Sequence, residues 1–108
     1  MKGEKYVLWF DELELDDIPE VGGKNASLGE MRRGLTAKGV SIPDGFAVTA
    51  HAYRYLLASS GIEKKIEQTL SGLDTHDMKN LSERGEKIRS LIYNAALPDD
   101  LRSAIVEA

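Results

Sequence analysis

The feature that most constrains this chain is a pair of glycines, Gly22 and Gly23, followed at once by Lys24 and an amphipathic helical pattern. Glycine permits backbone conformations and close approaches that other residues do not. Amide N–H groups at the start of a helix attract anions, so a glycine turn there lets a phosphate reach the main chain. The lysine adds a mobile positive charge. The segment therefore predicts one wall of a nucleotide-phosphate site, with Gly22, Gly23 and Lys24 as the binding residues.

The same segment matches neither of the two common phosphate-binding motifs. A Walker A loop needs Ser or Thr directly after the lysine, where this chain has Asn25, and a glycine at the position of Ile18. The chain also contains no G-x-G-x-x-G fingerprint. From the residue types alone, a tight glycine turn with an exposed lysine therefore stays open as the alternative.

Composition excludes several classes of protein. The chain has 108 residues, which suits one small domain. Its formal net charge of -4 gives no general basic surface for nucleic acid, and the absence of cysteine excludes disulfides and thiolate metal sites. No apolar run approaches the roughly 20 residues of a membrane span, and no signal peptide is recognisable. These features favour a cytoplasmic protein.

The hydrophobic pattern predicts a mixed α/β (α+β) fold with two or three short strands and about five helices. Apolar, β-branched and aromatic runs indicate strands at residues 6–10 and 46–48. Lys38 and Gly39 are a typical helix C-terminus, and Thr49 is a good N-cap. The expected helices begin or end near these signals, at residues 24–38, 50–60, 62–71, 78–95 and from 98 onward.

In the first predicted helix, Leu28, Met31 and Leu35 recur at steps of three and four and should form the packed stripe. Arg32 and Arg33 lie off this stripe. They could face an anion, but a solvated helix face is the favoured interpretation. The same periodicity places Tyr53, Leu56 and Leu57 of the next helix inward.

An acidic block with no basic residue follows the first predicted strand. A solvated loop is the favoured interpretation, and a magnesium or partner site is the alternative. His51 and His76 lack the spacing of a metal or catalytic pair, so we predict no catalytic residue and no metal ligand in this chain. The block contains Asp11, Glu12, Glu14, Asp16, Asp17 and Glu20.

Two long motifs carry a family resemblance. The first is VGGKNASLGEM at residues 21–31, and the second is GVSIPDGFAVTA at 39–50, followed by Ala52 and Tyr53. Together they resemble the start of the phosphoenolpyruvate synthase (pyruvate, water dikinase) family. The resemblance is strongest over residues 21–57 and thin from Gly72 onward.

The resemblance implies that residues 1–108 are part of an N-terminal ATP-grasp nucleotide-binding domain, truncated at its C-terminal end. The family lysine that contacts ATP phosphates maps onto Lys24, and the turn before it maps onto Gly22 and Gly23. In the family, ATP phosphorylates a histidine on another domain, and pyruvate then receives this phosphate. With magnesium, the enzyme converts ATP, pyruvate and water to AMP, phosphoenolpyruvate and phosphate, and the full-length protein is expected to be a cytoplasmic homo-oligomer.

The pattern is also incomplete. The last predicted helix has no stop signal before Ala108, and the family's phosphate-binding arginine, metal carboxylates and phosphorylated histidine are expected beyond that residue. We therefore expect a fragment that has no synthase activity alone and depends on further domains. The alternatives are a relative of rifampicin phosphotransferase or of pyruvate, phosphate dikinase, and a stand-alone binding module without catalysis.

Overall fold

The computed structural model describes residues 2–108 and combines helices with one small sheet. The described residues form two strands and six α-helices, so the expected mixed fold is found. Its two strands are antiparallel, which identifies the α+β class. The chain divides into two compact units, one made of the residues up to 54 together with 99–108, and the other of residues 55–98. Each unit is described by itself.

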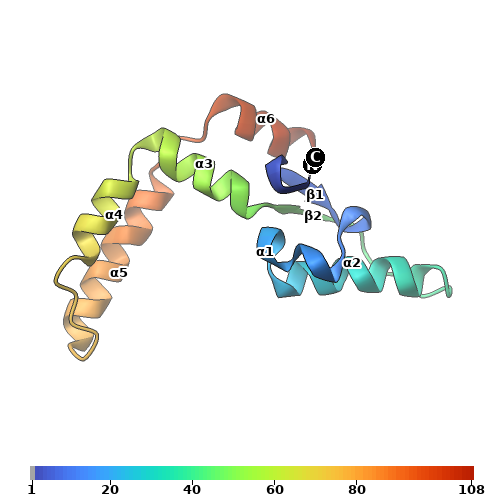
Figure 1. The fold of residues 1–108 in the computed structure, drawn as a ribbon, viewed down its shortest axis with the longest axis horizontal. Helices are drawn as coiled ribbons and strands as arrows, with labels where there is room; N and C mark the ends of the chain where they lie inside the picture. The colour runs from blue at the N-terminus through green and yellow to red at the C-terminus, as the bar shows by residue number, and fades with distance from the viewer. Residues whose placement is uncertain (1) are drawn as a thin grey trace. The chain divides into compact units, whose positions relative to one another are not determined.

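The first unit contains the strands and the glycine-rich segment (Figure 1). Three short 3-10 helices accompany its strands and α-helices. Helix α3 (Ala50–Ser60) begins in this unit and ends in the other. The remaining elements are η1 (Lys2–Glu4), β1 (Val7–Trp9), η2 (Phe10–Glu12), η3 (Leu15–Asp17), α1 (Ile18–Val21), α2 (Gly23–Thr36), β2 (Phe46–Val48) and α6 (Asp99–Glu107).

Strands β1 and β2 pair with Leu8 opposite Ala47. Both of these residues are buried, because side chains alternate across a strand and theirs share the face that is turned to the core. On the opposite face, the rings of Trp9 and Phe46 lie 5.3 Å apart between centroids. Both strands predicted from apolar runs are therefore confirmed, each three residues long.

The fully buried residues of helix α2 are its smallest ones, whereas Leu28 and Leu35 of the predicted apolar stripe are half-buried. Ala26 and Gly29 are its buried residues, whereas Met31 is 41% exposed. A Cβ atom built on Gly29 would lie only 2.6 Å from Leu13 Cβ, so the helix touches the segment after η2 at this glycine. The prediction that Met31 lies on the packed face is wrong, because close approach at Ala26 and Gly29 determines which side of the helix is covered.

Helix α2 ends with the predicted glycine cap. Gly39 has φ +84°, its N–H donates to Thr36 O, and Val40 N–H donates back to Leu35 O at 3.0 Å. This is the pattern of a Schellman motif, in which a glycine with positive φ lets two amides satisfy the last carbonyls of a helix. The helix stops at Thr36, two residues before the predicted end at Lys38.

Thr49 joins β2 to α3 and is almost completely buried. Its Oγ1 accepts a hydrogen bond from Ala52 N–H at 3.2 Å and donates one to Lys5 O at 2.6 Å. The predicted N-cap is therefore confirmed, with an added link to the chain before β1. Ala52 is the buried residue of α3, and Tyr53 is 46% exposed, so the inward position predicted for Tyr53 is wrong.

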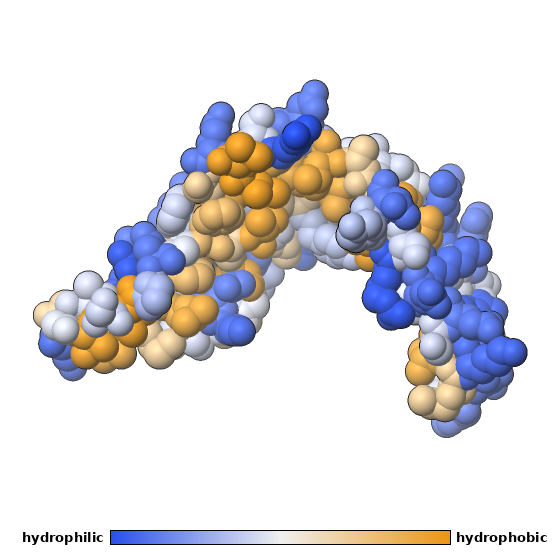
Figure 2. All heavy atoms as spheres, turned by 180° about the vertical axis from the view of Figure 1, so that it is seen from behind, coloured by the Kyte–Doolittle hydropathy of each residue, from blue (hydrophilic) through white to orange (hydrophobic). Residues whose placement is uncertain are grey.

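The second unit is a pair of adjacent helices, α4 (Glu63–Leu70) and α5 (Met78–Tyr93), which lie side by side in Figure 1. Arg84 of α5 donates to the carbonyl oxygens of Thr69 and Ser71, so these hydrogen bonds join the C-terminal end of α4 to α5. This pair presents mostly hydrophilic residues on the face seen at the lower right of Figure 2.

Candidate functional site

Gly22 separates α1 from α2 and belongs to the capping of both. Its N–H donates to Ile18 O at 2.8 Å, and its carbonyl accepts from Ala26 N–H at 3.1 Å. The backbone has φ +83° and ψ 163°, a region open essentially only to glycine. The first predicted site glycine is thus required by the fold, because any other residue here would be strained.

Gly23 opens α2, and no packing explains its lack of a side chain. A Cβ atom built on Gly23 would meet no described atom within 4 Å, and its φ lies outside the glycine-favouring range. Alanine would therefore fit and would favour the helix. The bare backbone instead leaves space in front of the first turn of α2, which is the condition for close approach by a ligand.

The first turn of α2 presents unpaired amide groups. Among residues 2–108, the structure gives no hydrogen-bond acceptor to the N–H groups of Gly23, Lys24 and Asn25. The Asn25 side chain does not cap them, because its Nδ2 donates to Val21 O at 2.9 Å. This turn contains no acidic residue. It therefore has a positive local field and free donors, a combination that attracts anions.

Lys24 is exposed beside these amides. No carboxylate of the described residues forms an ion pair with it. The structure therefore brings all three predicted site residues together at one helix start, with the lysine available for a ligand. An ammonium group on a flexible stem can follow a phosphate through small movements, since it acts as a point charge.

Arg32 binds protein groups and not an external anion. Its Nε lies 2.7 Å from Asp11 Oδ1 and 3.3 Å from Asp44 Oδ1, and its Nη1 donates to Ile42 O at 2.6 Å. The side chain is only 22% exposed. The solvated position predicted for Arg32 is wrong, because the segment after α2 folds back over this arginine. Arg33 is more open and pairs with Glu30 at 3.0 Å.

The acidic block is not a loop. It forms η2, η3 and α1, and two of its carboxylates cap η2 and η3. Glu12 accepts from Trp9 N–H at 2.9 Å, and the buried Asp17 accepts from Glu14 N–H at 2.9 Å. The prediction of a solvated loop is therefore wrong, although Asp11, Glu14 and Asp16 remain exposed. Sequence reasoning missed this role, because capping depends on each carboxylate's place in a turn.

The described residues contain no group of three or more His, Asp or Glu residues that could hold a metal ion. His51 lies in the first turn of α3 and stacks on the ring of Tyr6, with the centroids 5.6 Å apart and the planes 9° apart. His76 lies in the connector before α5. In residues 2–108, no helix is both long enough and apolar enough to cross a bilayer.

The amino-acid sequence of the chain matches a known protein family. Residues 18–108 match the model of the pyruvate phosphate dikinase AMP/ATP-binding domain. The chain belongs to this family. The matched residues include α1, Gly22 and the open start of α2.

Three relatives from different bacteria are named phosphoenolpyruvate synthase. The chain is 50% identical over 102 residues to a phosphoenolpyruvate synthase from Synechocystis, covering 94% of the chain and 12% of the relative. It is also 50% identical over 104 residues to the Aquifex aeolicus protein of that name, covering 96% and 12%. The Escherichia coli protein of that name is 43% identical over 102 residues, covering 94% and 13%. The chain therefore spans about 12% of the length of these relatives.

Proposed function

We propose that this chain is the phosphate-contacting part of an ATP-grasp nucleotide-binding domain in a phosphoenolpyruvate synthase. The observation that carries the proposal is the start of α2, where three free amides and an unpaired Lys24 face open space beside Gly23. The family match and the names of the relatives support ATP as the ligand. They also favour the synthase over a rifampicin phosphotransferase.

In this proposal the residues have separate roles. Gly22 fixes the direction of the first turn of α2, and Gly23 keeps the space in front of the amides free of a side chain. Lys24 neutralises charge on the phosphoryl oxygens as ATP transfers its phosphate to a histidine elsewhere in the enzyme. Stabilisation of this kind is the main contribution of a protein to phosphoryl transfer, because positioning and charge determine the barrier.

Magnesium would neutralise phosphate charge in the same reaction, but the described residues do not form a site for it. In the acidic block before α2, Glu12 and Asp17 are engaged as caps, and Asp11 is paired with Arg32. We therefore assign no magnesium ligand to this chain. The proposal also implies pyruvate as the final phosphate acceptor, a cytoplasmic homo-oligomer, and no synthase activity for these 108 residues alone.

The role of Lys24 is tested by Lys24→Gln in the full-length enzyme that the proposal implies, with phosphohistidine formation from radiolabelled ATP as the readout. We expect the rate to fall about 100- to 1,000-fold, the range for loss of one transition-state contact. Thermal unfolding should not change, because an exposed, unpaired lysine contributes little to stability.

Lys38→Gln is the matched control, since Lys38 is exposed just after the other end of α2. This variant should phosphorylate the histidine at the rate of the unmodified enzyme. An unchanged rate in Lys24→Gln, with Lys38→Gln as reference, would refute the assigned role. A stop codon close after Ala108 in the gene would refute the multidomain enzyme and leave a small anion-binding module.

A further inference from the structure

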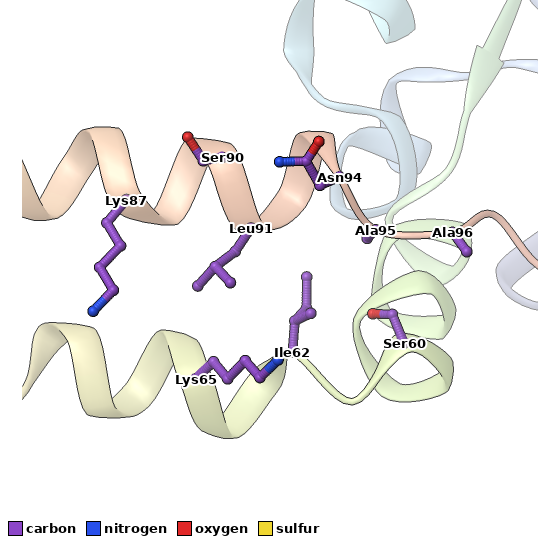
Figure 3. A pocket seen from close by; sticks show the side chains of 9 residues that line it. All are labelled: Ser60, Ile62, Lys65, Lys87, Ser90, Leu91, Asn94, Ala95 and Ala96. Atoms are coloured by element: carbon purple, nitrogen blue, oxygen red, sulfur yellow. The ribbon is translucent and has the colours of Figure 1, made fainter.

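We draw no further inference here: the strongest candidate, the hollow between α4 and α5 (Figure 3), carries none, because its two lysines, Lys65 and Lys87, are exposed and point in different directions, so that its charged groups do not converge on one ligand.

Discussion

Gly23 and Gly29 occupy the same helix and have opposite surroundings. A Cβ atom on Gly29 would lie 2.6 Å from Leu13 Cβ and 2.7 Å from Phe10 O, whereas one on Gly23 would touch nothing within 4 Å. The fold needs a glycine at position 29, because another segment crosses the helix closely there. It does not need one at position 23. This difference teaches that packing requires a glycine at position 29 and not at position 23, so any requirement at Gly23 must come from the open start of α2.

The largest effect on stability that this comparison predicts is that of Gly29→Ala. Its new methyl group would overlap a backbone carbonyl, so α2 and η2 must move apart, at a cost of about 1–3 kcal/mol in the free energy of unfolding. Urea denaturation followed by circular dichroism measures this loss. Gly34→Ala is the control, because Gly34 also lies in α2 and has open space around it. It should raise stability by up to about 1 kcal/mol. Equal stability of the two variants would contradict the packing at Gly29.

A substitution at Arg32 tests how much its ion pairs and hydrogen bond stabilise the packed side of α2. Arg32→Met keeps the length of the side chain but removes its contacts with Asp11, Asp44 and Ile42 O. We expect a loss of about 1–3 kcal/mol, because a partly buried carbonyl then lacks its donor. Arg33→Met should cost less than about 1 kcal/mol, since its ion pairs are more exposed. The same denaturation measurement ranks them, and a larger loss for Arg33→Met would show that Arg32 does not hold the segment.

Gly23→Ala tests whether the open space at the start of α2 is used by a ligand. Stability should stay the same or rise by about 0.5 kcal/mol, because alanine fits and favours the helix. ATP binding should weaken by about tenfold, since the methyl group occupies space in front of the free amides. Thermal unfolding and calorimetric titration with ATP in the full-length enzyme measure the two effects separately. Gly34→Ala again serves as control, and unchanged ATP affinity in Gly23→Ala would show that the open space has no ligand.

The smallest effect is expected for Met31→Gln. Because Met31 is 41% exposed, the change should cost less than about 1 kcal/mol in the free energy of unfolding. A loss of several kcal/mol would place Met31 on a packed face, as the apolar periodicity of α2 alone predicts. Denaturation midpoints of Met31→Gln and the unmodified chain decide between the two faces.

Signals that depend on neighbouring residues in the sequence predicted local structure well. The strand at β2, the cap at Thr49 and the turn at Gly39 each follow from a short pattern whose physical cause is local. The Gly22–Lys24 segment was predicted as a site in the same way and stays a prediction; the structure adds that the N–H groups of Gly23 and Lys24 have no acceptor and that the space beside Gly23 is open.

Features that depend on segments distant in sequence were predicted poorly. The periodicity of α2 indicates an apolar stripe, but Ala26 and Gly29 decide the packed face and carry almost no hydrophobic signal. The role of Arg32 depends on a segment ten residues later that returns to the helix. The acidic block looked like a loop because its carboxylates are charged, whereas the structure uses two of them as hydrogen-bond acceptors at short helices.

Gly22 has a consequence for how the proposed site could vary among related sequences. One backbone torsion, φ at +83°, ends α1 and starts α2, so it also sets the direction in which the first amides point. The Asn25 side chain adds one hydrogen bond across the turn, to Val21 O, but it does not set this torsion, so substitutions around the turn cannot change the direction of the amides gradually. We expect related sequences either to keep the direction of these N–H groups or to lose it through one substitution at Gly22. Ligand preference should change through residues elsewhere.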